Sequence, residues 1–307
     1  MQMSRFVFPR GTLDEFVRDI AGCEDAGFDG VWAPQIFGWD ALLALTLAGT
    51  RTSRIRLGTA VLPTHPVHPL SMAISAMTAA AAVDGRLTLG VGASHRFIVE
   101  GVWGLDYRRS VTRMRAYLTA LRAATSGEVV DVDTDMLTAR TAKPLELPDV
   151  APPRIVLAGL GPRMVATAGE LADGTITWLA GARTLGRRIV PAVSAAADTA
   201  RRPAPRVIAC LPICVTDDER AGRASAREFL SAYADVPSYR ALLDEEGVDE
   251  PADIALVGTE DRLREAMADL AAAGVTEFCA RILGGAESID RTTAFLTSAA
   301  ADLRDRK

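Results

Sequence analysis

Residues 155–179, which read IVLAGLGPRMVATAGELADGTITWL, contain the unit that decides the fold. The apolar, β-branched run 155–159 predicts a buried strand, and the amphipathic stretch 162–172 predicts a helix that begins with proline. A second apolar run at 175–179 predicts another strand. A strand, a helix and a second strand in this order favour two parallel strands joined by a crossover helix.

The same alternation of apolar and amphipathic runs extends along the whole chain. Strands are expected at residues 6–8, 30–34, 55–62, 86–92, 155–159, 175–179, 207–215 and 277–283. Helices are expected between them, at 13–26, 40–50, 69–83, 110–125, 162–172, 185–200, 217–234, 260–273 and 289–303. Because repeated strand–helix units of this number favour closure, the pattern predicts an α/β protein with a (β/α)8 TIM barrel rather than an open sheet.

Three segments interrupt this rhythm, and we interpret them as insertions in a single TIM-barrel domain that spans residues 1–307. They lie at about 93–109, 128–153 and 235–255. Short apolar runs at 129–132 and 136–139 predict a small hairpin in the second insertion. The polar stretch 237–253 lacks a clear period and predicts weak structure.

The charge balance limits the partners of the chain. Its 34 basic and 39 acidic residues give a net charge of −5, which argues against nucleic acid or an anionic membrane surface. No apolar run approaches the ~20 residues of a membrane span, and the N-terminus shows no charged-then-apolar leader pattern. We therefore expect a cytoplasmic protein that acts on a small molecule.

Several chemically useful side chains are scarce. The chain contains no Asn, which excludes mechanisms such as the kinase catalytic loop. Lys occurs only at 143 and 307, so a Schiff-base lysine at a strand end is not expected. The 3 His are too few for most zinc or iron sites, and no metal is expected. The four Cys, at 23, 210, 214 and 279, are scattered and are expected to be buried thiols in a reducing compartment.

In a TIM barrel, catalytic and binding residues follow the carboxyl ends of the strands. Gln35 follows the second strand, and its amide suits either the edge of a heterocycle or a loop carbonyl. The proline-rich loop after the third strand carries His65 and His68, and a histidine there either transfers a proton or holds the loop. Ser94 and His95 follow the fourth strand, but without a G-x-S-x-G elbow they do not predict a hydrolase.

Two glycine-containing segments are candidates for phosphate binding, and only the second is expected to be such a site. Gly90-x-Gly92 lacks a third glycine and does not predict a dinucleotide site. The turn 158–161 leads into a helix that begins at Pro162, and the free N–H groups of that helix point back at the turn. Such a helix start attracts anions, and Arg163 adds a charged donor. The alternative interpretation is a tight turn beside a surface arginine.

Five motifs in a fixed order carry a resemblance to a known family: GFDGVWA at 27–33, IRLGTAVLP at 55–63, GRLTLGVG at 85–92, AGLGPR at 158–163 and ELADG at 170–174. On these motifs the chain resembles the luciferase-like monooxygenase superfamily, and specifically its coenzyme F420-dependent oxidoreductase branch. The likeness is strong over residues 6–179 and extends to the rest in pattern. It implies a barrel that holds a deazaflavin or a flavin at the carboxyl ends of its strands.

The resemblance also implies which residues hold the cofactor. A non-prolyl cis peptide bond would fall at Ala60–Val61 and form a bulge behind the cofactor ring. The turn 158–163 would hold the phosphate. Together with Gln35, the expected cofactor-binding residues are Gln35, Thr59, Ala60, Val61, Gly92, Ala93, Ser94, Ala158, Gly159, Leu160, Gly161, Pro162 and Arg163.

One departure from the family narrows the expected reaction. Alcohol and sugar-phosphate dehydrogenases of this family resemble one another in an Asp-His pair after the second strand, where this chain has Gln35 and Ile36. Oxidation of an alcohol needs a base for the hydroxyl proton. The departure therefore favours hydride transfer involving an activated C=C or C=N bond, with His65 or His95 as the catalytic proton donor.

Two alternatives remain open at this stage. One is a monooxygenase that uses reduced FMN and oxygen and depends on a separate reductase to supply its cofactor. The other is a non-catalytic protein that binds a flavin or deazaflavin. The small residues at Thr59, Ala60, Gly92 and Ala93 indicate an open mouth, which disfavours the non-catalytic alternative. A homodimer is implied by the resemblance.

Overall fold

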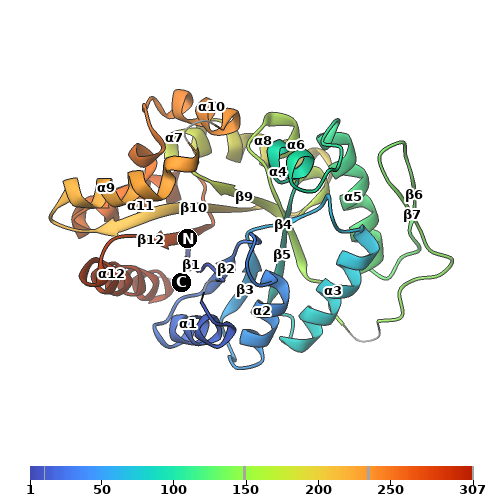
Figure 1. Cartoon of the computed structure of the whole chain (residues 1–307), viewed down its shortest axis with the longest axis horizontal. Helices are drawn as coiled ribbons and strands as arrows, with labels where there is room; N and C mark the ends of the chain where they lie inside the picture. Colours follow the sequence, from blue (N-terminus) through green and yellow to red (C-terminus); the bar gives the residue numbers. More distant parts are fainter. Residues whose placement is uncertain (10, 148–149, 234–235, 306–307) are drawn as a thin grey trace.

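A computed structural model describes residues 1–9, 11–147, 150–233 and 236–305 (Figure 1). Parallel strands form a closed barrel in the order β1 (Gln2–Phe6), β2 (Gly30–Ala33), β3 (Arg56–Thr59), β5 (Leu87–Gly92), β8 (Arg154–Ala158), β9 (Gly174–Trp178), β10 (Arg206–Val215) and β12 (Glu277–Ile282). Strand β10 pairs with β9 on one side and β12 on the other, and β12 pairs with β1. The predicted (β/α)8 barrel is confirmed.

Helices surround the barrel (Figure 1). They include α1 (Leu13–Asp25), α2 (Ala41–Gly49), α3 (Pro69–Ala82), α5 (Ser110–Thr125), α6 (Pro162–Leu171), α7 (Ala182–Thr184), α8 (Val190–Thr199), α9 (Glu219–Leu230), α11 (Glu260–Ala272) and α12 (Ala286–Asp305). A π-helical turn at Leu185–Ile189 joins α7 to α8. Local signals set these helix starts. Thr12 and Glu15 form a capping box before α1, and prolines begin α3 and α6.

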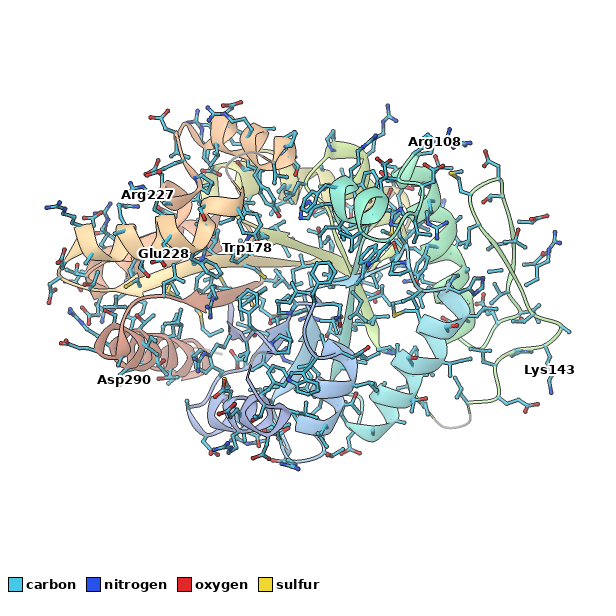
Figure 2. The ribbon with its side chains drawn as sticks, viewed as in Figure 1. Arg108, Lys143, Trp178, Arg227, Glu228 and Asp290 are labelled. Atoms are coloured by element: carbon cyan, nitrogen blue, oxygen red, sulfur yellow. The ribbon has the colours of Figure 1, made fainter. Side chains whose placement is uncertain are left out.

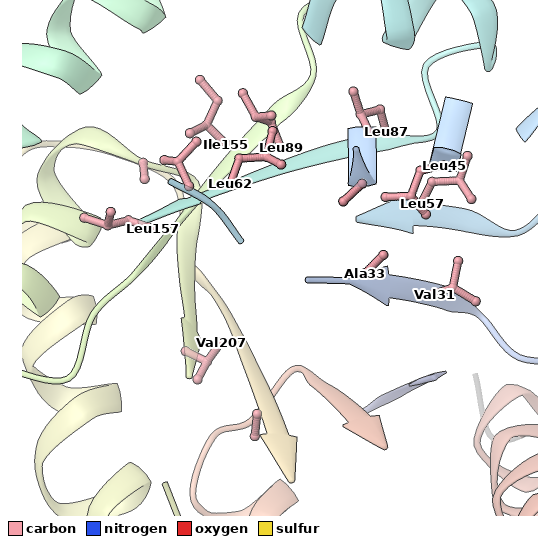
Figure 3. Packing of buried hydrophobic residues seen from close by; sticks show 14 of the residues in the cluster. Val31, Ala33, Leu45, Leu57, Leu62, Leu87, Leu89, Ile155, Leu157 and Val207 are labelled. Carbon is pink, nitrogen blue, oxygen red and sulfur yellow. The ribbon is translucent and has the colours of Figure 1, made fainter. Parts of the chain in front are cut away.

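The core has two parts because side chains alternate along each strand. Outward-facing residues such as Val31 and Leu57 pack against the helices and are 1% exposed. Figure 3 shows Leu45 of α2 beside Leu57 in this layer. Inward-facing residues fill the barrel, where Trp32 and Ile208 belong to a separate buried cluster. The interior of the barrel is therefore packed with side chains.

Two predicted strands need correction. The first strand is Gln2–Phe6, not 6–8. Its polar Ser4 faces the barrel interior and is satisfied there by Glu277, which hid the strand from a pattern based on apolar residues. The predicted strand 55–62 is interrupted: β3 ends at Thr59, and β4 (Leu62–Pro63) resumes the pairing with β5. Between them lies the expected cis peptide bond, Ala60–Val61.

The insertions contain more structure than the sequence predicted. The hairpin is present as β6 (Asp131–Asp133) and β7 (Thr138–Arg140), and it extends from the side of the molecule (Figure 1). The first insertion contains the short helix α4 (Arg96–Gly101). Some residues of the predicted segments lie outside the described residues. They are 148–149 and 235, which belong to the other two predicted insertions, and 234, the predicted end of a helix.

The prediction of weak structure at 237–253 is wrong. This stretch forms α10 (Pro237–Glu246) and a 3-10 turn (Pro251–Ile254), followed by the additional strand β11 (Leu256–Gly258). Pro237 begins α10, Gly247 ends it in the left-handed conformation, and Leu242 and Leu243 are buried beneath it. Many polar residues on the outer face of α10 concealed these signals. Across the described ranges, no helix has the length and apolar character needed to cross a membrane.

Candidate active site at the carboxyl ends of the strands

A cavity of about 1290 Å³ opens at the carboxyl ends of the barrel strands. Its walls come from segments that are far apart in the sequence, including the loops after β2, β4, β5 and β8 and the residues next to α10. This is the end of a TIM barrel at which ligands bind. The volume exceeds the usual range for a small-ligand pocket.

The floor of the cavity is made of small side chains and bare backbone. Ala60, Val61, Gly92 and Ala158 line it. A Cβ on Gly92 would lie 2.7 Å from Cγ2 of Val61, and one on Gly90 would lie 1.9 Å from the carbonyl oxygen of Thr59. The two glycines therefore allow β5 to pack closely against the residues next to the cis bond. This packing accounts for both glycines without a dinucleotide motif. The result is a flat, apolar floor.

The turn 158–161 forms one wall and leads into α6. Within the described chain, the backbone N–H groups of Leu160, Gly161 and Arg163 donate to no group. Gly161 is the N-cap of α6 and supplies no side-chain cap, and a Cβ added to it would meet nothing within 4 Å. Unpaired N–H groups at the positive end of a helix form a site for an anion such as phosphate. Ala158, Gly159, Leu160 and Gly161 all line the cavity.

The last two residues of the predicted cofactor-binding segment 158–163 lie outside the cavity lining. Pro162 and Arg163 are exposed and do not line the cavity. Arg188 was not predicted from the sequence as part of the site. Its Nη1 donates to the carbonyl oxygen of Leu160 at 2.6 Å, and its Nε pairs with Glu245 at 2.8 Å. Arg188 therefore fixes the turn from behind. No local signal could show this, because the two segments meet only in the folded chain.

Gln35 lines the cavity, but its amide is already engaged. Its Oε1 accepts the backbone N–H of Ala41 at 2.8 Å, and its Nε2 donates to the carbonyl oxygen of Ile36 at 2.8 Å. The side chain thus links the loop to the start of α2. Thr59 is fully buried and does not line the cavity, because its hydroxyl bridges the backbone of Gly90. Both residues hold the wall in shape in this structure.

His95, Ser94 and Ala93 all line the cavity. The His95 ring stacks on Phe97, with ring centroids 5.6 Å apart. Burial lowers the pKa of His95, so the imidazole is neutral at pH 7. Ser94 has a φ of 61°, which turns the chain toward the cavity, and its carbonyl oxygen accepts a hydrogen bond from the hydroxyl of Tyr107 at 3.2 Å.

His65 and His68 lie away from the cavity lining. His65 is 7% exposed and stacks on Tyr107 at 5.4 Å, and neither ring nitrogen has a hydrogen-bond partner within the described residues. Burial and the nearby charge of Arg113 lower its pKa. His68 accepts the N–H of Leu70 and caps α3. Of the two predicted catalytic histidines, the structure therefore places only His95 at the cavity surface.

Aromatic side chains form the wall opposite the turn, and the sequence did not single them out. Trp178 at the end of β9 packs against Tyr233 at 5.9 Å, and Tyr233 packs against Tyr239 of α10 at 5.1 Å. Trp178 lies in the interior, whereas Arg108 and Lys143 lie at the periphery (Figure 2). This wall was not predicted, because residues 237–253, which contain Tyr239, were expected to have weak structure.

Charge is scarce in the cavity. Among the described lining residues, Asp40 is the only acid, and its carboxylate caps α2 by accepting the N–H of Leu43 at 2.9 Å. No lining residue in this part of the chain is Lys or Arg. The described residues contain no cluster suited to a metal ion, and all four Cys are buried and free, as predicted for the thiols. The site can hold a flat, uncharged ring with an anionic tail, but it offers no paired carboxylates for acid–base chemistry.

Comparisons with known proteins agree with this geometry. A model of the family described as "Luciferase-like monooxygenase" matches residues 2–289. A provisionally named coenzyme F420-dependent oxidoreductase of Mycobacterium tuberculosis is 29% identical over 84% of this chain and 87% of its own length. An F420-dependent hydroxymycolic acid dehydrogenase of the same organism is 30% identical over 73% of this chain and 66% of its own.

Solved structures show the same fold. The coenzyme F420-dependent tetrahydromethanopterin reductase of Methanopyrus kandleri superimposes with a TM-score of 0.81 at 19% identity, covering 98% of both chains. The monooxygenase RslO1 of Streptomyces bottropensis superimposes with a TM-score of 0.76 at 19% identity, over 99% of this chain and 100% of its own. Both reductases and oxygenases therefore share this architecture.

Proposed function

The chain belongs to the luciferase-like monooxygenase family, and from this premise we propose that it is an oxidoreductase that uses coenzyme F420 as its hydride carrier. The relatives reported above whose names include this cofactor support the proposal. The single structural observation that carries it is the floor and wall described above. A flat apolar surface at Ala60, Val61 and Gly92 ends at a turn with unpaired N–H groups.

The residues present fit a deazaflavin with a phosphate-bearing tail. The isoalloxazine-like ring would rest over the cis bond, where glycines leave no side chain in its way. The N–H groups of Leu160, Gly161 and Arg163 would hold the phosphate, and Arg188 keeps that turn in place. When bound, the cofactor supplies a hydride donor or acceptor, and the protein contributes position and the exclusion of water.

We propose that the substrate carries an activated C=C or C=N bond. Gln35 and Ile36 occupy the place of the Asp-His pair, and the amide of Gln35 is engaged in its own loop. Asp40 is the only acid among the described lining residues, and one of its oxygens caps α2, which disfavours it as the base for the hydroxyl proton of an alcohol. His95 is the group at the cavity surface that can hold or deliver a proton, and its ring makes no hydrogen bond to the described residues.

A substrate panel with reduced coenzyme F420 tests this reaction class. Oxidation of the deazaflavin is followed by its absorbance in the presence of a cyclic enone, an imine or a ketone. We expect turnover with the enone or the imine and none with the ketone. Turnover of the ketone alone would assign the chain to alcohol chemistry and contradict the proposed substrate class.

The competing function is oxygen insertion with reduced FMN supplied by a separate reductase. The likeness to RslO1 in fold makes it the second candidate. It predicts consumption of oxygen and incorporation of one oxygen atom into the product. A non-catalytic role is disfavoured by the volume of the cavity, which leaves space beside a bound cofactor.

We also propose that the chain forms a homodimer through an apolar face on α2 and α3. Leu47 is 37% exposed, and Leu43 and Ile74, which also line the cavity, are 69% and 48% exposed. Exposed apolar residues gathered in this way mark interaction surfaces. Light scattering after gel filtration should give twice the chain mass, and L43E should reduce it to that of one chain. A monomeric wild type would contradict this proposal. The cytoplasmic location stays a prediction.

A further inference from the structure

A second cavity opens at the opposite end of the barrel, where the strands begin. Its volume is about 660 Å³. Four arginines line it, namely Arg56, Arg86, Arg154 and Arg206, and none of the described lining residues is an acid. This concentration of guanidinium groups occurs in a chain whose net charge is −5. The overall charge of the chain therefore does not account for this cluster of arginines.

The strand register shows that three of these arginines face the barrel axis. Residues paired across parallel strands point to the same face of the sheet. Arg154 is paired with Thr88, and Arg56 is paired with Gly30, which in turn is paired with the inward-facing Ser4. Arg206 donates to the hydroxyl of Thr88 at 3.1 Å, which places Thr88 on the inner face as well. The arginines thus converge on one opening.

One carboxylate balances only part of this charge. Arg206 pairs with the buried Glu277 at 2.6 Å. Arg86 donates only to a threonine hydroxyl and to carbonyl oxygens, including that of Gly49 at 2.6 Å. Arg56 donates to the carbonyl oxygen of Asp29 at 3.3 Å. These bonds hold three guanidinium groups in place. They leave the positive charge of Arg56 and Arg86 uncompensated, because hydroxyl and carbonyl oxygens carry no net charge.

Arg154 differs from the other three. It is the first residue of β8, its side chain is exposed, and it has no hydrogen bond or ion pair within the described residues. Nothing in the fold uses this guanidinium. A flexible cation beside three pre-positioned ones can close on a ligand at little entropic cost to the rest of the site. Arginine also binds phosphate oxygens through two parallel hydrogen bonds.

From these observations we propose that the amino end of the barrel is a binding site for a polyvalent phosphate-type oxyanion, such as a diphosphate or the diphosphate group of a nucleotide. The volume of the cavity accommodates a ligand of this size. The hydroxyl of Thr88 and the side-chain amide of Gln2 line the same opening and can complete the recognition of oxygen atoms. The site lies at the opposite end of the barrel from the proposed cofactor and does not depend on the proposed function.

Calorimetric titration of the full-length protein with pyrophosphate at constant ionic strength tests this proposal. Neither coenzyme F420 nor substrate is present, so the outcome is independent of catalysis. We expect saturable binding, and we expect Arg154→Ala to weaken it about tenfold or more, since this change removes a charged donor. Arg154→Lys should restore part of the affinity because it restores the charge. Arg154 has no partner in the fold, so these variants should remain folded.

Two matched controls locate the binding. Arg220→Ala removes an equally exposed and unpartnered arginine on α9, and Arg163→Ala removes the arginine next to the turn at the other end of the barrel. Both should change the affinity by less than about twofold. Parallel titrations with ADP distinguish a nucleotide from a free diphosphate, and binding of either supports the proposal. No saturable binding, an unchanged affinity in Arg154→Ala, or a loss only in Arg163→Ala would overturn it.

Discussion

At the carboxyl ends of its strands the barrel presents aromatic rings, small side chains and unpaired backbone N–H groups, whereas at their amino ends it presents arginines around one buried carboxylate. The same strands supply both ends. At the carboxyl end, Val61, Gly92 and Ala158 leave space for a ligand. At the amino end, Glu277 is 2% exposed and binds Ser4, Trp32 and Arg206.

This difference shows how one fold separates ligand binding from stability. The lining of the carboxyl end is mainly apolar, with unpaired backbone N–H groups at the turn 158–161. At the amino end, polar groups inside the barrel satisfy one another. Substitutions should therefore have opposite effects at the turn and at the buried network: a loss of cofactor affinity with unchanged stability at Gly161, and a loss of stability with unchanged cofactor affinity at Glu277.

The largest expected effect is on stability and comes from Glu277→Ala. This change leaves Arg206 without its carboxylate and removes the acceptor for Ser4 and Trp32. Breaking a buried ion pair from one side costs about 3–5 kcal/mol. Denaturant unfolding should show this loss, whereas Glu265→Ala on the exposed face of α11 should not. A loss below about 1 kcal/mol would contradict a structural role for this network.

The second effect is on cofactor affinity and comes from Gly161→Leu. A side chain here enters the open space before the unpaired N–H groups and meets no protein atom at its Cβ. We expect the affinity for coenzyme F420 to fall about 100-fold, equal to about 2.7 kcal/mol, with the unfolding midpoint unchanged. Gly22→Leu on α1, where a Cβ also meets nothing, serves as the control. An unchanged affinity would remove the turn from the cofactor site.

The smallest of the three effects is on turnover and comes from His95→Gln. If the imidazole of His95 delivers the proton, turnover should fall about tenfold with little change in cofactor affinity. Because burial holds the pKa of His95 below its usual 6.5, the protonated form accumulates only as the pH falls below that value. The wild-type rate should therefore rise toward acid pH, and the variant should lose this rise.

His68→Gln is the matched control for that experiment, because His68 is exposed and caps α3. His65→Gln tests the second predicted histidine, which lies buried behind the cavity against Tyr107. A flat pH profile in the wild type, or a full rate in His95→Gln, would exclude this histidine as the proton donor.

Local sequence patterns were sufficient for the barrel and for half of the site. The apolar runs marked the barrel strands other than β1, and the proline that begins α6 marked the turn 158–161. Local patterns failed where a polar residue is satisfied by a distant partner. Ser4 faces the barrel interior only because Glu277 lies there, which shifted the predicted first strand toward Phe8.

The rest of the site depends on contacts between segments far apart in the chain. Trp178 and Tyr239 come together because α10 folds over the mouth, and a polar outer face concealed that helix. Arg188 acts on Leu160 from another helical segment. The arginines at the amino end come from separate strand starts and converge only when the barrel closes. No spacing of residues in the sequence indicates these contacts.

The central claim is that the carboxyl end of this barrel holds coenzyme F420. Its most direct test is a fluorescence titration of the purified protein with coenzyme F420 and, separately, with FMN. The proposal predicts micromolar binding of coenzyme F420, much weaker binding of FMN, and loss of the former in Gly161→Leu. Tight binding of FMN with weak binding of coenzyme F420 would contradict it and assign this end of the barrel to oxygen chemistry.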